Sequence, residues 1–305
     1  MDARTQAFRT INRDLLSRMA PDGGFGERPG ASTRADATAW AILVLRTSGT
    51  HIATLARARA RLAEEQRADG RVCVSRAHPD AHWPTALSVL AWKGSPEHRE
   101  AEARAVRFLL ETTGVHYRRD PDDPVAHDTL ILGWPWVDGT HSWVEPTAVA
   151  VWALRTVGQG AHPRVQDAIR LLLDRQLPQG GWNYGNTQVF GRMLDPTPEH
   201  TGAALHALAG CVAREQISAS LAYLQRHLVE IRTPIALGWS LLGLRAWNAV
   251  EGSVDTGAMV GHCLARQARY GLYDTGSLSL LLLSLLAPAD SNDAGEQSDA
   301  GSEQF

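Results

Sequence analysis

The chain has 305 residues, of which 44% are hydrophobic and 21% charged, as expected of a globular protein with a sizeable core. With 30 basic and 33 acidic residues the net charge is −3, so the chain lacks the basic character of a nucleic-acid-binding protein and no nucleic-acid partner is expected. The three cysteines are odd in number and widely spaced, which argues against a disulfide framework and suits a reducing compartment.

The N-terminus is polar and charged rather than typical of a secretory signal. The most apolar run, 278–287, is shorter than the roughly 20 residues that cross a bilayer. We therefore expect a cytoplasmic protein whose contact with a membrane is at most peripheral. Residues 289–305 are rich in Ser, Asp, Gly, Glu and Gln, which predicts a disordered acidic tail after one domain spanning residues 1–288.

A repeating unit runs along the predicted domain. Each unit has an amphipathic helix, a polar Gly-rich turn with an aromatic residue, and an apolar helix rich in small residues. The apolar helices are expected at 37–45, 84–91, 146–154 and 200–208, with weaker copies at 236–247 and 276–286. The first four carry a threonine near the start, at positions 38, 85, 147 and 201. Six units of about 48 residues fall within the range of helical-repeat proteins.

The two kinds of helix need different surroundings. Amphipathic helices such as 100–111 and 164–176 bury one face, whereas an apolar helix without a polar face must be covered on all sides. Two concentric rings satisfy both patterns, and no strand alternation of any length appears. We therefore predict an all-α fold, an α/α toroid of about six helical hairpins. An open α-solenoid is the alternative, but it usually leaves a polar face on each helix.

A conspicuous turn follows the fourth amphipathic helix. It reads Gln-Leu-Pro-Gln-Gly-Gly-Trp from Gln176 to Trp182, and an apolar helix with Thr201 near its start comes next. This pattern resembles the repeat of squalene–hopene cyclases and protein prenyltransferase β-subunits, the prenyltransferase and squalene oxidase repeat of the terpenoid cyclase toroids. The resemblance spans about residues 5–287 and is sharpest at 133–155 and 164–210. It implies a central apolar cavity that takes a prenyl, terpenoid or other long apolar molecule, although the repeat itself does not define an activity.

Acidic residues stand two places before the threonine in three units, at Asp36, Glu145 and Glu199. Inner helices of such a toroid run parallel, so their N-termini gather at one rim. The acids either cap the helices and complement their dipoles, or converge with His141, His200 and His82 over the cavity as acid and base. We take Asp36, Glu145, Glu199 and His200 as the candidate catalytic residues.

Cyclases that protonate an alkene carry Asp-x-Asp-Asp-Thr-Ala at this helix start, with the central Asp as donor. The corresponding segment here reads Arg34-Ala35-Asp36-Ala37-Thr38-Ala39. Only the central Asp is kept, and the nearby arginine favours its carboxylate form over the acid. Three hypotheses follow: an acid-initiated cyclase of the class II type, that is an isomerase or lyase; a non-catalytic binding or scaffold toroid; and one half of a two-component cyclase that needs a partner subunit.

Ten tryptophans are present, and aromatic faces both stabilise carbocations and pack prenyl chains. The tryptophans expected to line the substrate cavity are Trp40, Trp83, Trp136, Trp143, Trp152 and Trp239. Phe25 and Trp182 are instead expected to pin their turns.

No cofactor or metal is expected. A zinc-type prenyltransferase needs Asp, Cys and His ligands converging from inner helices, whereas the pair His262-Cys263 falls on a predicted outer helix. A literal Asp-x-Asp-Asp does begin at Asp120, in a long connection between about 115 and 144. With Asp128 it offers a possible divalent-cation site, and the connection offers a lid for the cavity.

Overall fold

Amphipathic and apolar helices alternate along the chain, as the sequence predicts. The structure is a computed structural model that describes residues 2–120 and 122–286. The predicted acidic tail lies outside the described residues. The outer helices are α1 (Ala3–Leu16), α3 (Ile52–Glu64), α5 (Arg99–Glu111), α7 (Pro163–Asp174), α9 (Ser218–His227) and α11 (Thr256–Ala265). The inner helices are α2 (Ala35–Ser48), α4 (Pro84–Trp92), α6 (Val144–Thr156), α8 (Pro198–Leu208), α10 (Pro234–Ala246) and α13 (Thr275–Leu286).

The remaining elements are short. They are α12 (Gln267–Tyr270), the 3₁₀ turns η1 (Pro96–His98), η2 (Arg214–Ile217) and η3 (Leu228–Glu230), and the antiparallel strands β1 (Gln188–Val189) and β2 (Arg192–Met193). With so little strand in the described part of the chain, the all-α prediction is confirmed.

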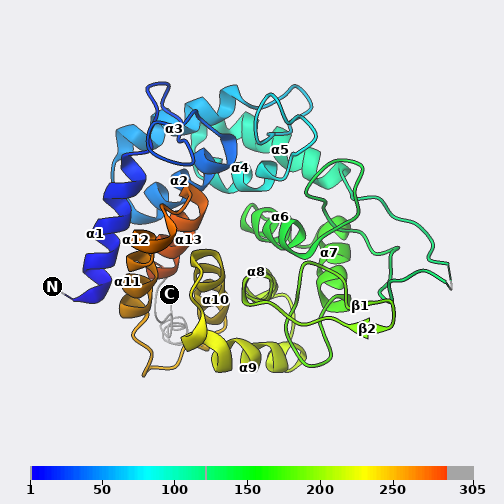
Figure 1. The fold of residues 1–305 in the computed structure, drawn as a ribbon. Helices are drawn as coiled ribbons and strands as arrows, with labels where there is room; N and C mark the ends of the chain where they lie inside the picture. The colour runs from blue at the N-terminus through cyan, green and yellow to red at the C-terminus, as the bar shows by residue number, and fades with distance from the viewer. Residues whose placement is uncertain (1, 121, 287–305) are drawn as a thin grey trace, which may run out of the picture.

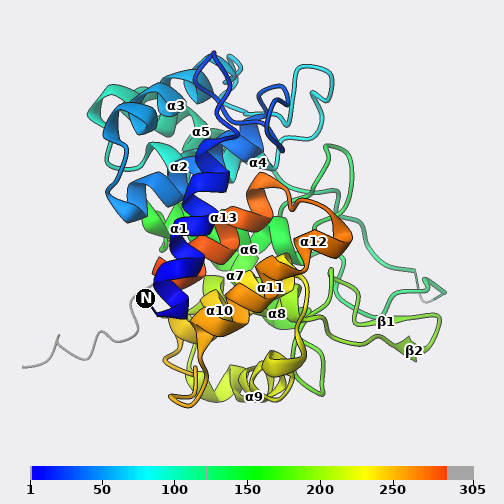
Figure 2. The same cartoon turned by 60° about the vertical axis from the view of Figure 1, so that its left-hand side comes forward.

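The inner helices form a closed ring. Each packs on the next in chain order, and α13 returns to pack on α2 (Figure 1). The outer ring closes as well, because α1 lies against both α11 and α13 (Figure 2). An open solenoid has no such contact between its first and last units. The α/α toroid is therefore confirmed.

Glycines bring the inner helices close together, especially α8 and α10. A Cβ atom added at Gly202 would lie 2.3 Å from the backbone carbonyl carbon of Trp239, and one at Gly243 would lie 2.6 Å from the carbonyl oxygen of Gly202. On the other side of α10, a Cβ atom at Gly238 would lie 2.8 Å from Leu280. The small residues of the repeat thus set the spacing of the inner ring.

The repeated threonine joins each inner helix to the turn that precedes it. In the first four units its buried hydroxyl oxygen accepts a 2.9 Å hydrogen bond from a turn backbone N–H; the pairs are Thr38 with Phe25, Thr85 with Val72, Thr147 with Trp134, and Thr201 with Trp182. Phe25 and Trp182 are fully buried, and the Trp182 indole also donates to the carbonyl of Leu172 at 2.6 Å. As predicted, these two aromatics pin their turns.

The long connection between α5 and α6 runs out to the edge of the molecule beyond α7, beside the β1–β2 hairpin (Figure 1). Backbone bridges join the two, including Val125 with Val189 and the Phe190 N–H with the Pro124 carbonyl at 2.8 Å. Farther along, the connection turns back to the inner ring at Trp136. Among the described residues of the connection, Trp136 is the one that lines the cavity.

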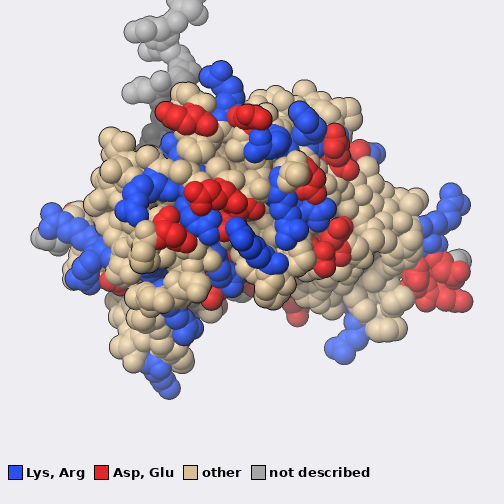
Figure 3. All heavy atoms as spheres, turned by 90° about the horizontal axis from the view of Figure 1, so that it is seen from above, with Lys and Arg blue, Asp and Glu red and all other residues tan. Residues whose placement is uncertain are grey.

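The surface carries both signs of charge. Figure 3 shows acidic and basic side chains interspersed over the face seen from above, which carries α3 and α5. Among the described residues, no helix combines the length and apolar character needed to cross a membrane.

Candidate functional site

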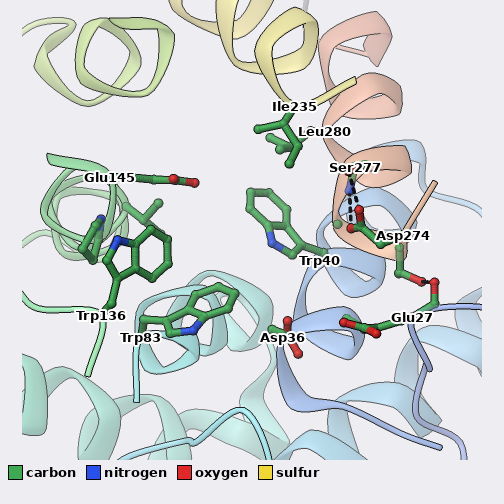
Figure 4. Close-up of a pocket in the computed structure, with 15 residues that line it drawn as sticks. Glu27, Asp36, Trp40, Trp83, Trp136, Glu145, Ile235, Asp274, Ser277 and Leu280 are labelled. Carbon is green, nitrogen blue, oxygen red and sulfur yellow. Dashed lines mark hydrogen bonds between the residues drawn. The ribbon is translucent and has the colours of Figure 1, made fainter. Parts of the chain in front are cut away.

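A cavity of about 250 Å³ lies where the inner helices begin. Its walls include Asp36 and Trp40 from α2, Glu145 from α6, and Ser277 from α13 (Figure 4). A wider hollow of about 540 Å³ adjoins it, shares Glu145 and Ser277, and extends to Glu199 of α8. The N-termini of the inner helices thus meet at one rim, as the sequence predicts.

Three of the predicted tryptophans line the cavity: Trp40, Trp83 and Trp136. The rings of Trp83 and Trp136 meet edge to face, with centroids 5.2 Å apart and an interplanar angle of 79°. Trp83 is the N-cap residue of α4, whereas Trp136 is delivered by the returning end of the long connection. The cavity therefore has a wall of aromatic surface on the side where α4 and α6 begin (Figure 4).

The other three predicted tryptophans are not among the residues that line this cavity. Trp239 is buried deeper in the ring and touches Trp40 edge to face, with centroids 5.9 Å apart. Trp152 packs in the same way against Trp239 and, at 4.8 Å, against His206. Trp143 is the N-cap residue of α6 and packs against His141 at 4.0 Å. Trp239 thus packs against Trp40 of the cavity wall, and Trp152 packs against Trp239.

Glu145 is the titratable group most altered by this environment. Its side chain extends from the first turn of α6 toward Trp40, and the surface it retains faces the cavity (Figure 4). Burial raises the pKa of Glu145 to about 7, the nearby charge of Glu199 adds to the rise, and the Trp239 indole opposes it. The Trp239 Nε1–H makes no hydrogen bond of normal length with any described residue. With this pKa, Glu145 is only partly ionised near neutral pH.

Asp36 has a different environment. Arg34 donates to it from Nε at 3.0 Å and from Nη2 at 2.9 Å, and Arg34 Nη1 lies 2.5 Å from Glu27 Oε1. Such a bidentate pair with a permanently charged guanidinium stabilises the carboxylate form. Asp36 thus lines the cavity while its carboxyl group is hydrogen-bonded to Arg34.

Glu199 and His200 stand at the start of α8. Glu199 lines the wider hollow opposite Glu145, and its Oε1 lies 3.8 Å from His200 Nδ1. His200 Nδ1 also lies 2.7 Å from the Thr197 hydroxyl, and burial lowers the pKa of His200 against the opposing effect of Glu199. His200 lines neither the cavity nor the hollow. The structure thus brings Glu145 and Glu199 together and places His200 behind them.

Two acidic residues of the cavity were missed from the sequence. Asp274 caps α13 by accepting from the Ser277 N–H at 2.9 Å and the Ser277 hydroxyl at 2.6 Å. It stands directly before Thr275, one place closer than in the other units, so the spacing rule did not detect it. Glu27 comes from the turn before α2, where no periodicity marks it. An acid immediately before Thr275, the threonine of the sixth unit, was the available signal.

The structure gives no support for a cation at Asp120–Asp128. The Asp120 and Asp123 carboxylates accept hydrogen bonds from backbone N–H groups of their own loop, at 3.0 and 2.8 Å. In the described ranges no three His, Cys, Asp or Glu side chains are arranged to hold a metal ion.

Comparison with known proteins identifies the fold. No family model and no curated protein matches the chain. Among solved structures it is similar to a protein from Actinoplanes (18% identity, TM-score 0.57, covering 93% of this chain and 98% of that one). It is also similar to the type II terpene cyclase MstE from Scytonema in its apo form (14% identity, TM-score 0.61, 94% and 98% covered). A variant of MstE solved with its substrate geranylgeranyl dihydroxybenzoate gives 13% identity and a TM-score of 0.62, with 93% and 97% covered.

The fold is therefore that of a terpene cyclase-like toroid. A structure described as an alpha-amylase from Clostridium perfringens matches at a TM-score of 0.59 with 8% identity, covering 94% of this chain and 98% of that one. Since such different activities share the architecture, function has to be argued from the cavity.

Proposed function

We propose that the protein binds a neutral prenyl chain in the cavity and starts its cyclisation with a proton from Glu145. The observation that carries the proposal is a carboxyl group with a pKa of about 7 facing a cavity walled by Trp40, Trp83 and Trp136. A carboxyl group with this pKa is still partly protonated near neutral pH, so it can donate a proton. The aromatic faces stabilise positive charge on carbon. The terpene cyclase-like fold and the prenylated substrate of MstE support this reading.

The proposed reaction is an isomerisation. The Glu145 O–H bond breaks and its proton adds to the terminal carbon–carbon double bond, which leaves a tertiary cation. In a substrate with a terminal epoxide the proton adds to the epoxide oxygen instead, and the C–O bond to the tertiary carbon breaks to leave a hydroxyl group and the same kind of cation. The π electrons of the next double bond close a ring and move the cation along the chain. Loss of a proton from the last cation to a carboxylate at the rim, a role we propose for Glu199, forms an alkene. Atoms and charge balance, and no cofactor takes part.

The acid strength of Glu145 bears on the substrate. Because burial weakens it as an acid, Glu145 protonates a basic oxygen more readily than an isolated alkene. We therefore favour a substrate with an epoxide at the end of the chain over a plain polyene.

The charges of the cavity favour a neutral ligand. The charged side chains that line it are all acidic: Glu27, Asp36, Glu145 and Asp274. Arg28 joins them only in the wider hollow. A diphosphate would meet like charge here, and such juxtapositions cost several kcal/mol.

A second function, binding without catalysis, is favoured by one observation. The residue that matches the proton donor of the resembling cyclases, Asp36, is paired to Arg34 through two hydrogen bonds. If Glu145 does not replace it, the protein holds an apolar molecule without converting it.

Tryptophan fluorescence tests the ligand class, since three tryptophans line the cavity. Geranylgeraniol should quench saturably and bind at least about tenfold more tightly than geranylgeranyl diphosphate. Trp83→Phe should weaken the binding, whereas Trp143→Phe, a matched change outside the cavity, should not. Equal affinity for the diphosphate, or equal effects of the two variants, would overturn the assignment of this cavity.

A further inference from the structure

A second pocket, of about 120 Å³, lies between the long connection and the C-terminal end of α7. Its polar lining consists chiefly of His116, His127, Thr129, His141, Arg175 and Asn186. None of the described residues that line it is acidic, in contrast to the cavity of the inner ring. Neither the repeat nor the proposed function uses these residues.

Three nitrogen atoms of this lining are buried without a hydrogen-bond partner among the described residues: Arg175 Nε, His116 Nε2 and His127 Nδ1. Only 4% of the Arg175 side chain is exposed. A buried polar group left unpaired costs about 1–3 kcal/mol, and more if it is charged. Three such atoms around one pocket indicate that something polar pairs with them.

The guanidinium of Arg175 is fixed in place. As the C-cap residue of α7, it donates from Nη2 to the Asp128 carbonyl at 2.8 Å and from Nη1 to the Asp174 carboxylate. These bonds hold the group rigidly and leave Nε for a ligand. The arrangement provides a preorganised donor with a permanent positive charge.

The charges around the histidines disfavour a cation. Burial is the main reason why the pKa of each ring is lowered, to about 4 for His127, and Arg175 lowers all three further. Arg164 acts on His116 in the same direction, as do His141 and Arg119 on His127. The Thr129 carbonyl opposes the shift at His116 and Asp128 opposes it at His127. Burial thus keeps the rings neutral, and the neighbouring positive charges, which an anion would offset, add to the effect.

We propose that this pocket binds a tetrahedral oxyanion, a sulfate- or phosphate-sized group that is either free or the end of a larger ligand. Arg175 Nε supplies a fixed donor, and His116 and His127 approach with unpaired nitrogens. This site is independent of the function proposed for the inner cavity.

Binding at this site takes up a proton. His116 Nδ1 lies 3.4 Å from the Thr129 carbonyl, which can only accept, so Nδ1 carries the proton of the neutral ring. Nε2 then carries the lone pair of the ring and becomes a donor only when the ring is protonated. An oxyanion stabilises that imidazolium, so affinity rises as the pH falls.

Calorimetry with sulfate tests the site, because the charge of sulfate does not change between pH 6 and pH 8. We expect sulfate to bind at least about tenfold more tightly at pH 6, with a heat that depends on the buffer because a proton is taken up. Arg175→Gln should weaken binding about tenfold or more. Arg170→Gln, the matched control, removes the same charge from the exposed face of α7, where Arg170 pairs with Asp167, and should leave affinity within about twofold.

His116→Asn is the second variant, since Arg175→Gln also removes bonds that hold the long connection. It should leave binding at pH 8 nearly unchanged and abolish the gain at pH 6. Geranyl phosphate tested against sulfate separates the two sources: tighter binding of geranyl phosphate assigns the pocket to the end of a larger ligand, and equal binding assigns it to the free ion. Absence of sulfate binding, or a weak pH-independent affinity equally affected by Arg170→Gln and Arg175→Gln, would overturn the proposal. Glu145→Gln should bind sulfate like the wild type. Sulfate binding therefore tests the anion site separately from the proposed cyclase activity.

Discussion

Arg34 holds Asp36 through two hydrogen bonds, from Nε to Oδ1 at 3.0 Å and from Nη2 to Oδ2 at 2.9 Å. The pair occupies the place where the resembling cyclases carry their proton donor. A guanidinium beside a carboxyl group favours the ionised form over the protonated form that a donor needs. Acid chemistry at this rim therefore has to come from elsewhere, and Glu145 on α6 has the altered pKa that suits it.

Asp36→Asn should accordingly act on stability more than on chemistry. We expect the free energy of unfolding to fall by about 1 kcal/mol, because Arg34 is one-third exposed and water screens part of the pair. Urea denaturation measures the loss, and a double-mutant cycle with Arg34→Gln should give a coupling energy of similar size. Loss of turnover in a folded Asp36→Asn protein would instead make Asp36 the donor.

The raised pKa of Glu145 predicts a particular dependence of stability on pH. Between the unfolded value of 4.5 and the folded value of about 7, the folded chain holds a proton that the unfolded chain has released. The contribution of Glu145 is therefore fully present below about pH 4.5 and is lost as the pH rises through about 7. Relative to Glu145→Gln, the wild type should lose stability from pH 5 to pH 8 in urea denaturation. A difference that does not change with pH would show that Glu145 is an ordinary carboxylate.

The order and type of the helices could be predicted because they follow from local periodicity. Apolar segments such as 146–154 lack a polar face and had to form the inner ring. The convergence of Glu145 and Glu199 also follows, since parallel helices place equivalent first-turn residues at one rim. What periodicity does not set is the rotation of each helix, and this rotation puts Trp40 in the cavity wall and Trp239 behind it.

Sites formed by loops without regular secondary structure could not be predicted from the sequence. His116, His127 and Arg175 come together only through the path of the long connection over the end of α7, and their spacing has no period. Asp274 was missed because the sixth unit shifts its acid by one residue. These positions depend on tertiary packing rather than on local pattern.

The repeated threonine gives a prediction about stability. Thr147→Val removes the acceptor for the Trp134 N–H, which is buried and lies 2.9 Å from the threonine hydroxyl. Leaving that N–H unpaired should cost about 1–3 kcal/mol in urea denaturation. Thr156→Val, on the same helix and without a side-chain hydrogen bond to any described residue, should stay within about 0.5 kcal/mol of the wild type. Equal effects of the two changes would mean that the hydroxyl bond contributes little.

Close approach of α8 and α10 gives a further prediction. Gly202→Ala places a methyl group 2.3 Å from the Trp239 backbone, so the helices must separate, and we expect a loss of at least about 2 kcal/mol. Gly261→Ala on α11, where an added Cβ atom meets nothing within 4 Å, should be neutral or stabilising by up to about 1 kcal/mol. Thermal denaturation of the two variants measures the contrast, and a stable Gly202→Ala protein would show that the inner ring tolerates wider spacing.

Product analysis by mass spectrometry is the most direct test of the proposed role of Glu145. The purified chain, without metal, would be incubated with geranylgeraniol and with its terminal epoxide, alongside Glu145→Gln and Asp36→Asn. We predict a cyclised isomer of unchanged mass from the epoxide, at least about a hundredfold less of it with Glu145→Gln, and a yield within about tenfold of the wild type with Asp36→Asn. Full turnover by Glu145→Gln, or saturable binding without any product from the wild type, would contradict the assignment of Glu145 as the acid.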